Sequence, residues 1–152
     1  YVRTRLVKPQ PRNSWNESAG LAVRVATILD FYMIGLGTVS FNPKTAHIFY
    51  LQNNFGIRNL RPTPFEWKIN KWYQLKVEAK GDQLKYYVDG KLLVDYKDGT
   101  YPTGRVAIWG GIHSTVFQYD DFMVVGPQVP NLNLSVSSQF KLATSWTSIK
   151  AD

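Results

Sequence analysis

Residues 72–90 constrain the fold more than any other part of the chain, because apolar and polar residues alternate there on both sides of a short turn. The apolar positions of the two halves are Tyr73, Leu75, Val77, Ala79, Leu84, Tyr86 and Val88. A period of two is typical of strands with one buried face, and residues 80–82 and the Asp-Gly pair at 89–90 are typical of turns. The segment therefore predicts an antiparallel hairpin with one dry face.

Further segments with the same alternation follow one another along the chain. The first spans residues 2–6 and stops at Pro9, since proline cannot donate to a strand ladder. Pro62 and Pro64 keep residues 56–64 off any central strand. The other predicted strands are residues 21–26, 31–36, 47–52, 92–96, 105–109 and 116–125. Many short strands between turns, without a sustained helical period, predict an all-β sandwich of two sheets.

Length and composition set broad bounds. The 152 residues predict one domain, and the absence of cysteine excludes disulfides and thiolate metal sites. The sequence contains neither a run typical of a membrane span nor a signal-peptide pattern. Its 18 Lys and Arg against 11 Asp and Glu give a formal net charge of +7, which favours polyanions by diffuse attraction. Because the basic residues are scattered, two interpretations stay open: the charge marks an acidic polysaccharide or nucleic acid as partner, or the protein merely has a cationic surface.

Five segments carry a resemblance to a known family. In chain order they are AGLAVRV at 19–25, DFYMIGL at 30–36, WYQLKVEAKGDQLKYYVDGKLLVDY at 72–96, GRVAIWGG at 104–111 and FQYDDFMVVG at 117–126. Together they resemble the concanavalin A-like lectin/glucanase jelly roll, in its laminin G-like bacterial branch. The most specific part is the tryptophan-led hairpin that ends in Val-Asp-Gly.

The resemblance implies a two-sheet antiparallel jelly-roll sandwich, export to the cell surface or beyond, and a concave sheet face that in many members holds a glycan. It assigns residues 1–126 to the jelly roll and leaves residues 127–152 as a linker and C-terminal tail. The family usually has one more strand before the first one found here. Either an upstream segment was removed or the tail completes the sheet edge, with residues 139–144 as the candidate strand.

The distribution of carboxylates argues against an enzyme of the glucanase kind. Glycosidic hydrolysis needs two carboxyl groups roughly 5 to 9 Å apart, which that branch supplies from a Glu-x-Asp-x-Glu run on one strand. The glutamates here are Glu17, Glu66 and Glu78, far apart in the sequence. A branch that resembles 3-keto-disaccharide hydrolases is an alternative, although its polar positions do not match. His113 would be its acid-base residue.

Asp120 and Asp121 are the candidate metal ligands. Alternation that places Phe122 and Val124 in the core would turn Asp120 inward, where an unpaired carboxylate is costly. Related carbohydrate-binding sandwiches use a similar Asp-Asp pair for a structural calcium ion, which oxygen ligands suit. The alternative is that Asp120 lies at the end of the sheet and accepts backbone N–H bonds.

Glycan binding requires rings that stack on sugar C–H faces together with groups that hydrogen-bond hydroxyls. Alternation places a set of such side chains outward or leaves them ambiguous, and Trp109 stands directly before two glycines, where a ring is openly presented. Packing alone also explains each ring. The predicted ligand-binding residues are Trp109, Arg24, Tyr32, Tyr50 and His113.

These observations predict a non-catalytic carbohydrate-binding or adhesive module of an exported bacterial protein, secreted or displayed on the cell surface. The predicted partner is a glycan or polysaccharide, with an acidic one as an open alternative, and calcium is the expected cofactor if there is one. A structural protein that pairs through a sheet edge and the tail is the second hypothesis, and a sugar-active enzyme is the third.

Overall fold

The computed structural model describes residues 1–8, 16–39, 42–51, 58–110, 116–127 and 129. Within these residues the chain forms ten strands and no helix, so this part contains no helix that could cross a membrane. In chain order the strands are β1 (Val2–Lys8), β2 (Asn16–Thr27), β3 (Asp30–Val39), β4 (Asn42–Leu51), β5 (Arg58–Pro64), β6 (Tyr73–Lys80), β7 (Gln83–Val88), β8 (Lys91–Lys97), β9 (Arg105–Trp109) and β10 (Val116–Asp120).

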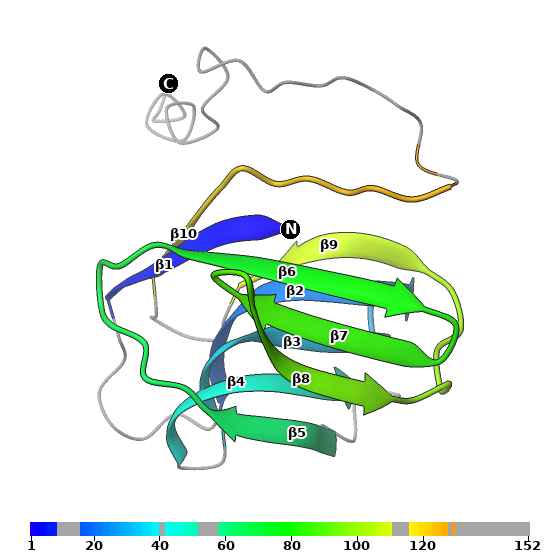
Figure 1. Ribbon diagram of the computed structural model, residues 1–152, viewed down its shortest axis with the longest axis horizontal. Coiled ribbons are helices and arrows are strands. Elements are labelled where there is room, and N and C mark those ends of the chain that lie inside the picture. The colour runs from blue at the N-terminus through cyan, green and yellow to red at the C-terminus, as the bar shows by residue number, and fades with distance from the viewer. Residues whose placement is uncertain (9–15, 40–41, 52–57, 111–115, 128, 130–152) are drawn as a thin grey trace, which may run out of the picture.

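The strands form two five-stranded sheets that stack face to face (Figure 1). Sheet A has the order β10-β1-β6-β7-β8, and sheet B has the order β5-β4-β3-β2-β9. Every strand pair is antiparallel. The predicted all-β, two-sheet antiparallel sandwich is confirmed.

The predicted hairpin is β6 and β7, paired with Leu75 opposite Val88 and Ala79 opposite Leu84. The following turn places Asp89 at φ 49° and Gly90 at φ 79°. Positive φ at both central residues is the signature of the tight hairpin turn that Asp-Gly favours. Local sequence therefore determines this part of sheet A directly.

The core lies between the inner faces of the two sheets. Alternate residues of the strands around it point into it. The largest fully buried side chains are Tyr32, Tyr86, Ile34, Ile48, Leu75, Leu84, His47, Val2 and Val88, of which His47 alternates on β4 with the core residues Ala46 and Ile48 and therefore faces the other side of sheet B. All of these except His47 belong to the main apolar cluster. Complete burial of each aliphatic side chain contributes about 1.5 to 3 kcal/mol of transfer free energy, so the sandwich needs no cross-link.

Two glycines allow β2 and β3 to lie unusually close together. Gly20 pairs with Gly35 in the register of the two strands. A Cβ atom on Gly20 would overlap the carbonyl oxygen of Ile34, and one on Gly35 would overlap that of Ala19. Both obstacles are backbone atoms, which cannot rotate away, so a side chain at either position would force the strands apart.

Two strand predictions were wrong in part. Residues 58–64 do form a strand, β5, but it lies at the edge of sheet B, where proline is tolerated. Strand β10 ends at Asp120 and does not continue to residue 125, because Asp121 adopts φ 52° and leaves the extended conformation. The predicted boundary between residues 126 and 127 stays a prediction, and the candidate strand at 139–144 lies outside the described residues.

Candidate functional site

The outer face of sheet A gathers a tryptophan and two arginines from neighbouring strands. Trp72 directly precedes β6, and Arg3 and Arg5 alternate on β1 with the buried Val2 and Thr4. The guanidinium carbon of Arg3 lies 5.3 Å from the centre of the Trp72 ring, and that of Arg5 lies 4.8 Å from it. These distances are in the range of cation–π contacts, so the three side chains form one surface.

Hydrogen-bonding groups of the β10 region border this surface. Arg3 forms an ion pair of 3.0 Å with the Asp121 carboxylate, and Arg5 Nε donates to the side-chain carbonyl of Gln118 at 2.6 Å. We call Trp72, Arg3, Arg5, Gln118 and Asp121 the Trp72 platform. It combines an aromatic ring, two guanidinium donors and two oxygen acceptors on a rigid sheet.

A second aromatic group lies on the same face. Tyr87 is opposite Lys76 in register, and the Lys76 ammonium lies 5.1 Å from the centre of the Tyr87 ring. The Tyr87 hydroxyl donates to Glu78 at 3.1 Å, and Lys76 pairs with the same carboxylate at 2.5 Å. These two hydrogen bonds, that of Lys76 first, lower the pKa of Glu78, so it stays ionised in this cluster.

Asp120 does not point into the core as predicted. It pairs in register with Arg3, whose neighbours on β1 are buried, so the backbone places Asp120 on the outer face and its side chain is exposed. Phe122, expected in the core, is 41% exposed. The prediction assumed that the strand continues to residue 125, whereas it ends at Asp120. The Arg3 guanidinium pairs with the Asp121 carboxylate and already neutralises its charge.

The calcium hypothesis stays a prediction. Among the described residues no three His, Cys, Asp or Glu side chains come together in a group that could hold a metal ion. Asp121 N donates to the Asp120 carboxylate at 3.0 Å, which matches the alternative of a sheet-end aspartate that accepts a backbone N–H bond.

Arg24 was predicted to point outward, and this orientation was wrong. The strand bulges between Val23 and Val25, and Arg24 adopts φ 53°, which turns its side chain into the molecule. The buried guanidinium donates to the carbonyl of Tyr101 at 3.1 Å and to the carbonyl of Gly81 in the β6–β7 turn. Arg24 therefore links sheet B to sheet A at one end of the sandwich.

Tyr32, which alternation left outward or ambiguous, is fully buried beside Arg24. Its hydroxyl donates to the Asp98 carboxylate and accepts a bond from the backbone N–H of Tyr101 at 3.2 Å. Burial, and next the Asp98 hydrogen bond, raise the pKa of Tyr32. Burial acts to raise the pKa of Asp98 too, but hydrogen bonds from Tyr32 and Thr100 outweigh it and lower that pKa.

Trp109 lies on the outer face of sheet B, on the edge strand β9. Its half-buried ring lies 5.3 Å, centre to centre, from that of Phe31. Both rings belong to a small apolar cluster with Ala22, Met33 and Val25. Trp109 is thus partly exposed and partly a packing residue.

The remaining predicted contacts are placed only in part. Tyr50 pairs with Tyr32 across β4 and β3, while its side chain and the whole of His113 lie outside the described residues. The ligand-binding role of all five predicted residues stays a prediction. The structure brings Arg24 and Tyr32 together, with the guanidinium carbon 6.0 Å from the ring centre, and leaves Trp109 on a separate surface.

His47 is fully buried on sheet B, with Nδ1 at 3.1 Å from the Thr45 hydroxyl. Burial lowers its pKa from 6.5 to about 3. The imidazole is therefore neutral throughout the physiological pH range and stays uncharged inside the fold.

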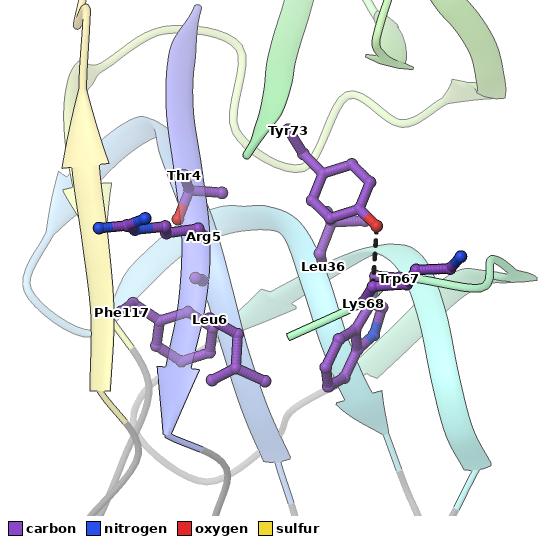
Figure 2. Close-up of a pocket in the computed structure, with 9 residues that line it drawn as sticks. Thr4, Arg5, Leu6, Leu36, Trp67, Lys68, Tyr73 and Phe117 are labelled. Atoms are coloured by element: carbon purple, nitrogen blue, oxygen red, sulfur yellow. Dashed lines mark hydrogen bonds between the residues drawn. The ribbon is translucent and has the colours of Figure 1, made fainter. Parts of the chain in front are cut away.

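A small cavity lies between the sheets beside β1 and β10 (Figure 2). Figure 2 shows Leu6 and Phe117 on one side and Trp67 and Tyr73 on the other, with the Tyr73 hydroxyl accepting a bond from the backbone N–H of Lys68. Its volume of about 10 Å³ is that of a single water molecule. A sugar is too large to enter this cavity.

Sequence reasoning missed the Trp72 platform. The signal was available in part, since Arg3 and Arg5 occupy alternate positions of the first strand and therefore one face. What could not be read from the sequence is that β1 lies between β6 and β10, which brings Trp72 and Gln118 to the same arginines.

Comparison with known proteins gives a similar stretch of sequence and a similar fold. No family model matches it. A stretch of 56 residues, 37% of this chain, is 38% identical to the levanase of Bacillus subtilis, and it covers 8% of that protein. Among solved structures, the carbohydrate-binding module CBM66 from Bacillus subtilis is similar with a TM-score of 0.57 over 79% of this chain and 72% of that one, at 19% identity. The chain therefore has the fold of that module.

Proposed function

We propose that this chain is a non-catalytic carbohydrate-binding module of a bacterial protein that acts outside the cell. The observation that supports this most directly is the fold that it shares with CBM66 over most of its length. The stretch that is similar to a levanase adds a link to a carbohydrate-active protein, of which this chain spans a small part. Such a module holds its partner protein on a polysaccharide.

The surroundings of the described glutamates favour binding over hydrolysis. Glu66 forms a surface ion pair of 3.0 Å with Lys44, and Glu78 is held by Lys76 and Tyr87. A hydrolase needs one protonated and one ionised carboxyl group across the same glycosidic bond. The Lys76 hydrogen bond lowers the pKa of Glu78, so Glu78 stays ionised and does not supply the acid.

The test of this proposal is binding of the full chain to immobilised polysaccharides, measured by affinity gel electrophoresis. Levan, for which the similar levanase is named, belongs in the panel. Of the predicted contacts, Trp109 is partly exposed, whereas Arg24 and Tyr32 are buried. Trp109→Ala is therefore the first variant to compare. Retarded migration on at least one polysaccharide is expected, and migration unaffected by the whole panel would refute the proposal.

A second candidate function is assembly through a sheet edge. Strand β9 is an edge strand of sheet B, and its Val106 and Ile108 are 39% and 42% exposed. Phe122 and Met123, which follow β10, are exposed as well. Apolar groups beside an open edge favour pairing with another strand. A change of oligomeric state on deletion of residues 131–152, measured by light scattering, would support assembly, and an unchanged monomer would exclude it.

A further inference from the structure

The Trp72 platform is built on adjacent, paired strands. Its side chains come from β1, from Gln118 of β10, from Asp121 directly after β10 and from Trp72 directly before β6, and β1 pairs with both β10 and β6. Side chains fixed on a sheet lose little freedom when a ligand binds, which favours affinity. The half-buried Trp72 ring and its two flanking guanidiniums are therefore preorganised at the surface.

The platform has hydrogen-bonding capacity that the protein does not use. A guanidinium group carries five N–H donors. In the described part of the chain, Arg3 makes one side-chain hydrogen bond, to Asp121, and Arg5 makes one, to Gln118. The Arg3 and Asp121 side chains are 40% and 50% exposed and Gln118 is exposed, so further donors and acceptors are open to a ligand. Donors and acceptors side by side suit hydroxyl groups, since each hydroxyl both donates and accepts.

Most cations of this face lie beside a carboxylate. Arg3 is matched by Asp121, Lys76 by Glu78 and Lys85 by Asp95, at 3.0, 2.5 and 3.8 Å. Arg5 is the exception, since it donates to the neutral Gln118 amide, but the exposed Asp120, the register partner of Arg3, adds a second carboxylate next to the platform. The formal net charge of +7 is therefore not concentrated around the platform. A polyanion would meet a carboxylate beside nearly every cation, whereas an uncharged polyhydroxyl chain would find partners of both kinds.

The second aromatic ring lies along the same face. Tyr87 is the register partner of Lys76, which lies four residues after Trp72. Four residues span about 13 Å along an extended strand. This separation is longer than one sugar ring. A ligand that contacts both rings must therefore be a chain of several sugar units.

We infer that the Trp72 platform, extended to Tyr87, is the binding surface for a neutral polysaccharide chain. This inference rests on the proposed function and names both its site and the class of its ligand. Trp72 stacks on a sugar ring, Arg3 and Arg5 donate to hydroxyls, and Asp121 and Gln118 accept from them. Trp109, on the opposite sheet, lies outside this surface.

The experiment measures binding of the full chain and its variants to neutral polysaccharides, levan included, and to alginate as an acidic polymer, at low and high salt. Trp72→Ala should weaken binding to the neutral polymer at least tenfold, as expected for an aromatic anchor. Arg5→Lys keeps the charge but loses the planar donor fork, and it should weaken binding severalfold. Trp72→Phe should retain part of the affinity. Ile28→Ala is the control, because Ile28 is 85% exposed in the β2–β3 turn at the other end of the sandwich.

Each result is decisive. The inference is supported if Trp72→Ala and Arg5→Lys lose binding to the neutral polysaccharide while Trp109→Ala and Ile28→Ala keep it. Salt should change this binding little. If Trp109→Ala loses binding and Trp72→Ala does not, the proposed function stands and the site is wrong. Binding to alginate alone, abolished by salt, overturns the ligand class. Binding to no polysaccharide overturns the proposed function itself. A circular dichroism spectrum of each variant that matches the parent excludes unfolding as the cause.

Discussion

The buried His47 makes the stability of the sandwich depend on pH. In the unfolded chain its imidazole has the ordinary pKa of 6.5, while burial lowers the folded value to about 3. Between these values the unfolded state binds a proton that the folded state rejects, so folding stability is fully present above pH 6.5 and is lost as the pH falls toward 3. The loss is about 2 kcal/mol at pH 5, about 4 kcal/mol at pH 3 and levels off at about 5 kcal/mol below that.

Urea unfolding, followed by tryptophan fluorescence at pH 7 and pH 5, measures this effect. His47→Gln keeps a polar group near Thr45 and removes the titrating imidazole. The stability of the parent chain should fall by about 2 kcal/mol more than that of the variant between these pH values. His113→Gln corrects for the second histidine of the chain. Equal losses in the parent and in His47→Gln would refute the assignment.

Three further predictions follow from the fold and from the calcium hypothesis. Arg24→Met removes the buried donor that links the sheets and should cost about 2 to 4 kcal/mol in urea unfolding, whereas a loss below about 0.5 kcal/mol would show that Arg24 is no cross-link. Gly35→Ala forces a Cβ against the Ala19 carbonyl and should cost about 1 to 3 kcal/mol, and a thermal melt equal to that of the parent would contradict this close approach. If Asp120 and Asp121 bind calcium, millimolar CaCl2 should raise the melting temperature and EDTA should reverse the rise, while identical melts would remove the metal site.

Local patterns predicted the parts of the fold that local forces determine. The hairpin of β6 and β7 followed from alternation and from its turn residues, and the structure has it at the expected positions. Pro62 and Pro64 correctly kept residues 58–64 off any central strand, but the segment still forms β5, because an edge strand tolerates proline. Whether a strand lies at the edge or in the centre of a sheet depends on the sheet order, which one sequence does not reveal.

Orientation failed where the backbone leaves the regular strand conformation. Alternation places Arg24 outward and Asp120 inward, and both are wrong in the structure. In the first case a bulge and a positive φ turn the side chain inward. In the second, Asp120 pairs with Arg3 on the outer face, and the strand ends there because Asp121 adopts a positive φ. Such irregularities arise from packing between elements, and no residue type in the sequence indicates them.

The candidate site was predictable only in kind. Aromatic rings together with Arg24 and His113 were expected on one sheet face, and of these the structure places Trp109 and Arg24 in different parts of the fold. The Trp72 platform depends on β1 lying between β6 and β10. This pairing joins residues from the two ends of the described chain, a contact that short-range patterns cannot indicate.

The most direct test of the account is a two-dimensional ¹H–¹⁵N NMR titration that follows the indole N–H signals of the five tryptophans. Trp72→Phe identifies the Trp72 signal, and Trp67, whose buried indole donates to the Gly37 carbonyl at 3.4 Å, serves as the internal reference. On addition of a levan oligosaccharide, or of another neutral oligosaccharide that binds, the Trp72 signal should shift while that of Trp67 stays. A shift of the Trp109 signal with Trp72 unmoved would contradict the account.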